Sequence, residues 1–245
     1  YGLQSASNAR ADNAALISAL GQWLAQPQMT LGNTAIPLEQ LRTAYLPGNG
    51  QPFWVDANGI TPRGQAVLSV LSHAGDEGLN PERYGISTLS ALLAEKPASG
   101  EAALANRLSL ELLTSTAIMR YTADMHAGVA RHQWNTLRAH ATPEEQTAML
   151  MATTTAPDAA AYLSSLSPAT PGYAALKTAL AQHQALATQG GWPAFPQGAT
   201  IKPGMSDARI PTLRQILAIT GDLPATTAPS ATPNLYDAAT VAAVE

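Results

Sequence analysis

An apolar repeat of helical spacing across residues 101–125 is the strongest constraint that this sequence places on its fold. Apolar side chains return every three to four positions on one stripe, and a second set of positions widens it. A helix with so wide an apolar face has to be covered on several sides, so we expect it at the centre of a helical domain. The first stripe is Leu104, Leu108, Leu112 and Thr116, and Leu113, Ala117 and Tyr121 widen it.

Start signals for further helices recur along the chain. Thr61-Pro62 combines an N-cap threonine with proline at the first helical position, and Asn80-Pro81 repeats the device. The run Thr142-Pro143-Glu144-Glu145 predicts a capping box. Alternating strand patterns are scarce, and only the surroundings of Ile201 suggest one short extended piece. The sequence therefore predicts a mostly α fold.

Residues 190–223 have a different character, because turn residues are dense there. Gly190 ends one helical pattern, Lys202-Pro203-Gly204 forms a polar hinge, and one short amphipathic helix is expected within residues 207–220, with Leu213 and Leu217 inward. Residues 224–234 read as a low-complexity, mobile loop, and a last helix should open at 235–237. Two short helices bury little area. We therefore expect the first of them to pack on the helical domain or on a neighbouring molecule, in a module that is unfinished at Glu245.

Composition argues against several classes of protein. Only 12% of the residues are charged and the net charge is −4, with no basic cluster, which argues against nucleic-acid binding and against an anionic membrane surface. No apolar run approaches the ~18 residues that a bilayer crossing needs, and no signal peptide is visible. There is no cysteine, so disulfides and a cysteine nucleophile are excluded within this chain.

The residue types that carry catalysis are present but poorly spaced for it. The five histidines form no HExxH motif and no i, i+4 pair, so we predict no metal site and no cofactor. There is no GxSxG or Ser-x-x-Lys motif for a serine nucleophile. The acidic pairs Asp76/Glu77 and Glu144/Glu145 are sequence neighbours, whose side chains diverge on a helix. A self-sufficient hydrolase would require Glu111, Asp124 and His126 to converge on a cleft.

Arg120, Asp124 and His126 form a candidate polar cluster near the end of the long helix. Arg120 and Asp124 are four residues apart, so they can pair on one helix face. One interpretation is an ordinary structural ion pair, and the other is a polar knot that fixes the helix end at Gly128. We favour the structural interpretation, because most ion pairs are structural.

Trp54 and Trp192 are candidate glycan contacts, because both lie in turn-rich segments and an indole ring can stack on a sugar. The alternative is that each tryptophan fills a gap in the core, with its N–H bonded at the edge. We favour packing, because large aromatic side chains are mostly buried.

Three separated blocks, in this order, resemble one family. The first covers residues 45–84 and includes Pro52-Phe53-Trp54, Thr61-Pro62-Arg63-Gly64 and the run from Gly78 to Tyr84. The second covers residues 112–128 (LLTSTAIMRYTADMHAG), and the third covers residues 173–223. Together they resemble the large Gram-negative murein L,D-transpeptidases, which carry a helical scaffold domain ahead of the catalytic domain.

The resemblance implies a domain division and a function. Residues 1–195 would be the helical scaffold domain, and residues 199–245 would begin a peptidoglycan-binding-like domain. The family joins peptidoglycan stem peptides through a Cys thiolate, so no catalytic residue can be assigned in this chain. The implied partners are peptidoglycan, the protein's own C-terminal catalytic domain and other cell-wall proteins, and the implied location is the periplasm. The alternative is a stand-alone periplasmic protein that binds peptidoglycan or serves as an adaptor.

Overall fold

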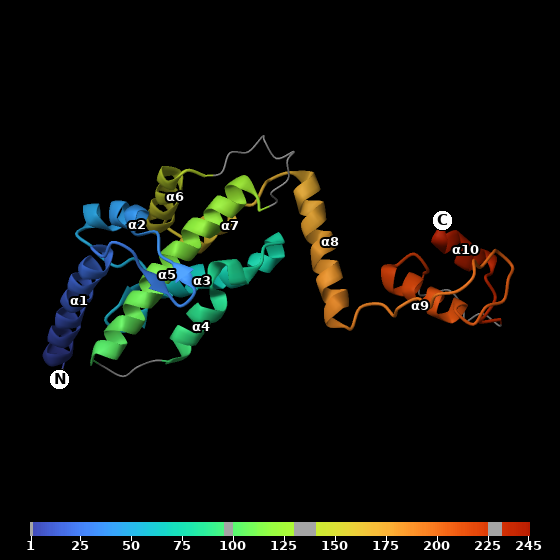
Figure 1. Ribbon diagram of the computed structural model, residues 1–245, viewed down its shortest axis with the longest axis horizontal. Helices are drawn as coiled ribbons and strands as arrows, with labels where there is room; N and C mark the ends of the chain where they lie inside the picture. Colours follow the sequence, from blue (N-terminus) through green and yellow to red (C-terminus); the bar gives the residue numbers. More distant parts are fainter. Residues whose placement is uncertain (1, 96–99, 130–140, 225–231) are drawn as a thin grey trace. The chain divides into compact units, whose positions relative to one another are not determined.

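The computed structural model describes residues 2–95, 100–129, 141–224 and 232–245, and these residues are mostly helical, as predicted (Figure 1). The chain divides into two compact units, Tyr1–Tyr173 and Ala174–Glu245. Most of the loop expected at 224–234 lies outside the described residues.

The first unit contains seven α-helices among its described residues, with short 3-10 turns and two very short hairpins between them. The helices are α1 (Gly2–Leu24), α2 (Leu38–Tyr45), α3 (Pro62–Ser72), α4 (Ile86–Glu95), α5 (Gly100–Ala127), α6 (Pro143–Thr155) and α7 (Ala159–Ser164). The 3-10 turns are η1 (Leu46–Gly48), η2 (Ala74–Glu77) and η3 (Pro81–Tyr84), and the strands are β1 (Thr30–Leu31), β2 (Thr34–Ala35), β3 (Val55–Asp56) and β4 (Gly59–Ile60).

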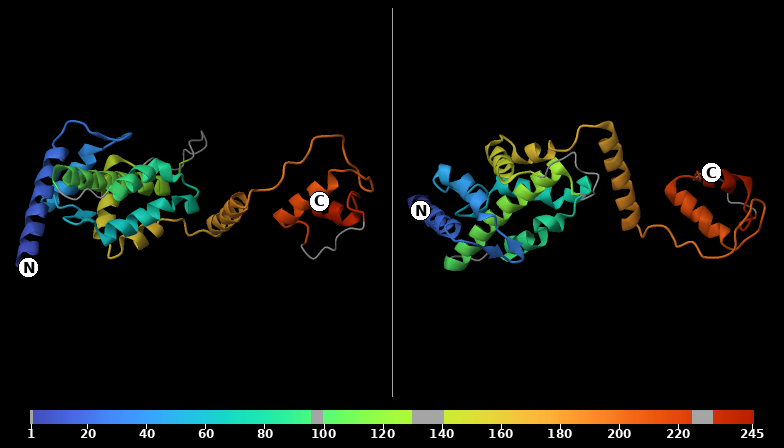
Figure 2. Two further views of the ribbon diagram at one scale, coloured as in Figure 1. Left: turned by 90° about the horizontal axis from the view of Figure 1, so that it is seen from below. Right: turned by 45° about the horizontal axis from the view of Figure 1, so that its top comes forward.

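Helix α5 is the central element of the first unit, as its wide apolar stripe predicts. It contacts α1, α3, α4 and α6, and Figures 1 and 2 show it with helices on several sides. Leu108, Leu112 and Ile118 are almost or fully buried in the core around it. Burial of such side chains is worth about 1.5–3 kcal/mol each, so α5 anchors the packing of its neighbours.

Two hairpins interrupt the helices, although the sequence showed no strand pattern at either place. Strands β1 and β2 pair antiparallel, with Thr30 opposite Ala35, and β3 and β4 pair with Val55 opposite Ile60. Each strand has two residues, which is too short for an alternating pattern to show. The second hairpin lies close to α3: a Cβ added at Gly64 would be 2.6 Å from the Trp54 carbonyl oxygen. The absence of a side chain at Gly64 therefore allows this close approach.

The predicted N-terminal caps are confirmed. The Thr61 hydroxyl accepts a hydrogen bond from the Gly64 amide at 3.1 Å, with Pro62 at the first position of α3. At the start of α6, the Thr142 hydroxyl and the Glu145 side chain form the reciprocal capping box. These caps satisfy amides that a helix start leaves unpaired.

Two helix C-termini in the first unit are held by arginines from other helices. Arg42 on α2 donates to the carbonyl oxygens of Leu24 and Gln26 at the end of α1. Arg63 on α3 donates to three carbonyl oxygens at the end of α6, namely those of Thr153 and Thr154 at 2.8 Å and of Ala156 at 2.6 Å. A cation at this position also complements the negative end of the helix dipole.

The second unit takes in most of α8 (Pro171–Thr188), together with α9 (Ile210–Thr220) and α10 (Ala238–Val244). Helices α9 and α10 pack on each other. Ile210 and Leu217 are buried, whereas Leu213, also expected inward, is half-buried. An isolated antiparallel bridge joins Ser206 and Leu235, so the extended pairing lies a few residues beyond the expected position at Ile201. Packing of α9 on the first unit or on another molecule remains a prediction.

Candidate functional site

A buried carboxylate on α5 is the most connected polar group of the first unit. Glu111 is fully buried, and its two oxygens accept four hydrogen bonds. Oε1 accepts from the Tyr45 hydroxyl at 2.6 Å and from the Phe53 amide at 2.6 Å. Oε2 accepts from the amides of Trp54 at 2.9 Å and Val55 at 3.0 Å. Glu111 therefore ties the central helix to α2 and to the segment that enters β3.

The electrostatics of Glu111 balance burial against these donors. Burial raises the pKa of Glu111 to about 7, while the Tyr45 hydroxyl and the three backbone amides oppose the rise. Burial, followed by the nearby Glu111 charge, also holds the pKa of Tyr45 well above its ordinary value. A carboxylate that is enclosed and bonded by four donors holds the backbone in place and offers no free oxygen to a substrate. Glu111 therefore does not support the hydrolase alternative.

Trp54 belongs to the same buried network, so its candidate role as a glycan contact is corrected. Its side chain has no exposed surface, and its indole N–H donates to the Ser115 hydroxyl at 2.8 Å. The Tyr45 and Ser115 hydroxyl oxygens lie 2.7 Å apart. The favoured alternative, a packed indole with its N–H bonded at the edge, describes Trp54.

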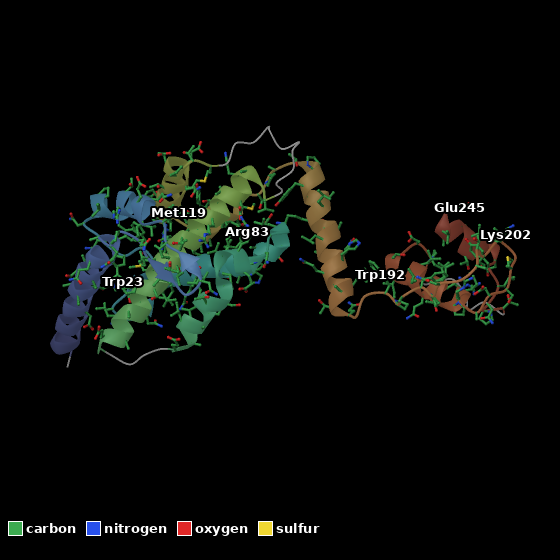
Figure 3. The ribbon with its side chains drawn as sticks, in the orientation of Figure 1. Trp23, Arg83, Met119, Trp192, Lys202 and Glu245 are labelled. Carbon is green, nitrogen blue, oxygen red and sulfur yellow. The ribbon has the colours of Figure 1, made fainter. Side chains whose placement is uncertain are left out.

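Asp124 has different partners from those predicted. Arg83 on η3, which Figure 3 labels, donates to both of its oxygens, at 2.9 and 3.0 Å. The Tyr84 hydroxyl donates to it at 3.0 Å. Arg120 instead donates to the Ala35 carbonyl oxygen at 3.4 Å, so the expected Arg120–Asp124 pair is corrected to Arg83–Asp124. A guanidinium that binds a carboxylate through two parallel hydrogen bonds interacts with it more strongly than one that shares a single bond.

His126 lies two residues beyond Asp124 on α5 and is exposed. Burial, followed by the charge of Arg83, lowers the pKa of Arg120. Two members of the predicted polar knot, Arg120 and Asp124, lie close enough to interact, because the Asp124 charge raises the pKa of Arg120 and so opposes part of that shift. The cluster fastens η3 to the last turns of α5, which is a structural role.

Trp192 is the candidate glycan contact that remains accessible. It follows the end of α8, and 47% of its surface is exposed (Figure 3). Its ring meets the His183 ring edge to face, with centroids 6.3 Å apart. Sugar stacking by Trp192 stays a prediction.

The polar contacts of the second unit lie near its surface. Arg209 pairs with Asp207 at 2.9 Å and lies over the Phe195 ring, 5.7 Å from its centroid. Arg214 pairs with Asp237 at 2.6 Å, and Asp237 caps α10 by accepting from the Thr240 amide. The second unit has a cavity of about 610 Å³ beside Phe195 and Leu213, and the first unit has one of about 550 Å³ beside Asn106 and Arg107.

Sequence reasoning missed the roles of Glu111 and Arg83. A signal for Glu111 was present: it lies three residues after Leu108 and four before Ser115, within the widened apolar stripe of α5. A charged residue among apolar neighbours on a central helix needs buried partners.

Among the described residues, no group of three or more His, Asp or Glu side chains is arranged to hold a metal ion.

A family model described as "Scaffold domain" matches residues 39–180, which is more than half of the chain. The chain belongs to the Scaffold domain family. The matched part of this scaffold domain contains α2 to α7, with the Glu111 and Asp124 networks. No curated protein and no solved structure gave a significant match. Among the helices described for the scaffold domain and the second unit, none is both long and apolar enough to cross a membrane.

Proposed function

We propose that this chain is the non-catalytic, N-terminal part of a periplasmic murein L,D-transpeptidase, in which it positions a Cys-dependent catalytic domain on peptidoglycan. The observation that carries the proposal is that side-chain hydrogen bonds join the first two blocks which resemble this family, and that Tyr173, the first residue of the third block, is bonded to the first block. Trp54, Arg83, Ser115 and Asp124, which make these bonds, all lie within the first two blocks.

The first and second blocks are joined twice. Trp54 of the first block donates to Ser115 of the second at 2.8 Å, beside the four bonds that Glu111 accepts. Arg83 and Tyr84 of the first block both donate to Asp124 of the second. Each of these hydrogen bonds requires both partners, although the two lie tens of residues apart in the sequence. The bonds therefore favour a fold shared with the family over a chance similarity of short motifs.

The third block is joined to the first through its leading residue. The Tyr173 hydroxyl donates to Glu77 at 2.6 Å, and Ser167 donates to the same carboxylate at 2.8 Å. Burial, followed by the hydrogen bond to Glu77, raises the pKa of Tyr173. Glu77 thus anchors the first turn of α8, from which the chain continues toward the module that the resemblance describes as peptidoglycan-binding-like.

The division of labour follows from the chemistry. A thiolate nucleophile needs a cysteine and an activating partner, and the sequence has no cysteine. We therefore assign the reaction to a further domain, and to residues 1–195 and 199–245 the tasks of positioning that domain and holding peptidoglycan or another cell-wall protein.

The intact mass of the natural protein, together with its reading frame after Glu245, tests this function. We expect a further domain with a Ser-x-Gly-Cys motif. A frame that stops at Glu245 contradicts the proposal and favours the second candidate, a stand-alone wall-binding or adaptor protein. The exposed ring of Trp192 favours that candidate.

Retention on purified sacculi separates the two candidates further. The stand-alone candidate requires that the 245-residue chain sediments with sacculi at low salt and that Trp192→Ala weakens retention. Leu176→Ala is the matched control, because Leu176 on α8 is likewise a large exposed hydrophobic side chain. No retention counts against the stand-alone candidate.

A further inference from the structure

A continuous groove crosses the first unit between the β3–β4 hairpin and helices α3, α4 and α5. It consists of two cavities of about 550 and 470 Å³. Both are lined by Ile60, Gln65 and Leu93, so the cavities adjoin along these three residues. Each volume falls within the range of small-ligand sites, about 300–1,000 Å³.

The first cavity is lined by both polar and aliphatic side chains. The polar ones supply three side-chain amides and one guanidinium. The polar residues are Asn58, Gln65, Asn106 and Arg107, and the aliphatic ones include Ile60, Leu92, Leu93 and Leu110. Among the residues that line the two cavities, Arg107 is the charged one. The second cavity adds the hydroxyls of Ser69, Ser72 and Ser90.

Two hydrogen bonds hold the Arg107 guanidinium in place and leave some of its N–H donors available. Its Nε donates to the Ala103 carbonyl oxygen at 3.1 Å, and one terminal nitrogen donates to the Ala57 carbonyl oxygen at 2.5 Å. A guanidinium has five N–H donors, so these two contacts fix its direction and leave others available. The Ala57 contact also fixes the turn of the β3–β4 hairpin, which forms one edge of the cavity.

The three side-chain amides of the cavity differ in how many hydrogen bonds they make within the protein. Asn106 donates to the Leu92 carbonyl oxygen at 2.9 Å and lies 3.4 Å from a Glu95 oxygen, which leaves its own side-chain oxygen to accept. Gln65 and Asn58 are exposed, and within the described part of the chain their side-chain amides make no hydrogen bond. The cavity therefore presents free donors and free acceptors together, beside one oriented cation.

We propose that this groove binds a peptidoglycan stem peptide, with Arg107 pairing a carboxylate and Gln65 and Asn58 pairing backbone amides. An amide side chain offers one acceptor and two donors, which complements a peptide group. A guanidinium matches a carboxylate through two parallel hydrogen bonds. The aliphatic lining residues suit the methyl groups of alanine residues. The assignment to peptidoglycan rests on the proposed function.

Isothermal titration calorimetry of the 245-residue chain with a free stem tetrapeptide tests the site. Two comparison ligands accompany it: an N-acetylglucosamine oligomer, which lacks both carboxylate and peptide, and an unrelated tetrapeptide of the same charge. We expect measurable binding of the stem tetrapeptide, weaker binding of the unrelated one, and none of the sugar oligomer. Equal binding of the two peptides, or binding of the oligomer alone, overturns the assignment.

Variants locate the binding. Arg107→Gln should weaken tetrapeptide binding by about tenfold or more, because charge-assisted hydrogen bonds are lost. Gln65→Ala should weaken it about fivefold, as expected for a neutral hydrogen bond, and among the described residues it breaks no side-chain hydrogen bond. Gln22→Ala on α1 is the matched control, because Gln22 is likewise an exposed helical glutamine. Unchanged affinity in Gln65→Ala contradicts the proposed site even if Arg107→Gln fails to fold.

The two proposals fail in different ways. If the reading frame continues to the Cys motif while the tetrapeptide does not bind, the groove assignment is wrong and the proposed function stands. If the frame stops at Glu245, the transpeptidase function is wrong, whereas tetrapeptide affinity and its loss in Gln65→Ala are still measured directly.

Discussion

The two units use their charged groups in opposite ways. In the first, a fully buried Glu111 accepts bonds from groups 56 to 66 residues away. In the second, Arg209 pairs with a residue two positions away, and the Arg214–Asp237 side chains keep 17% and 30% of their surface exposed. A buried charge is costly to leave unpaired, whereas an exposed pair contributes little and is screened by salt. The first unit therefore contains a buried carboxylate that its donors must satisfy, whereas the ion pairs described in the second unit remain partly exposed.

The largest effect should come from removal of the buried carboxylate. Glu111→Ala leaves the Tyr45 hydroxyl and three backbone amides without their acceptor in the core. We expect the free energy of unfolding to fall by about 3–5 kcal/mol, measured by urea denaturation. Glu39→Ala on the exposed face of α2 is the control and should change it by less than about 0.5 kcal/mol. A small loss in Glu111→Ala would mean that the network is dispensable.

The two units should respond to pH with opposite signs. Because the pKa of folded Glu111 is about 7, the folded first unit binds a proton more tightly than the unfolded chain. Its unfolding free energy should therefore rise as the pH falls from 7 toward 4.5, by up to about 3 kcal/mol. In the second unit, Arg209 lowers the pKa of Asp207 to about 2, and the Thr240 amide lowers that of Asp237. Their contributions are present above pH 4 and are lost as the pH falls toward 2.

Resonances in each unit can report this contrast separately. Unfolding of the first unit can be followed through the Trp54 indole N–H, and that of the second through the backbone amides of α10. Glu111→Gln is the matched control, since the amide does not titrate, and it should flatten the pH dependence of the first unit between pH 5 and 7. A first unit that loses stability on mild acidification would reverse the sign derived from Glu111.

The smallest effect should be at the cap of α10. Asp237→Ala removes the acceptor of the Thr240 amide, at 3.0 Å, and the partner of Arg214. Loss of an N-cap costs about 1 kcal/mol, so the Val241 amide, which bonds to the Asp237 carbonyl oxygen, should exchange with solvent about fivefold faster. Asp222→Ala, beyond the end of α9, is the control. Unchanged exchange would show that the cap adds nothing to α10.

Features set by neighbouring residues were predictable from the sequence. The caps at Thr61 and Thr142 depend on residues three positions apart, and both are present. The central position of α5 followed from its apolar stripe. The β3–β4 hairpin was not predictable, because its strands are two residues long and its entry is held by Glu111 on a distant helix.

The candidate site was predicted less well than the fold, because its contacts join residues that are far apart in the sequence. Spacing correctly put Arg120 near Asp124, yet spacing cannot show that Arg83, 41 residues away, supplies the two-bonded partner. Trp54 lies in a turn-rich segment, which suggested exposure, and only the fold shows that it is enclosed. The amides of the groove come from three separate elements, so no local pattern joins them.

The arginine cap of α6 limits how this domain can be shortened. Arg63 reaches the last carbonyl oxygens of α6, 90 to 93 residues further along the chain. α6 ends at Thr155, and its C-cap residue is Ala156 rather than a glycine. A fragment that stops before residue 156, or begins after residue 63, therefore separates the helix end from the arginine that completes it. Dissection of the chain into soluble pieces should therefore keep residues 63–156 together, and the first useful cut lies beyond α7.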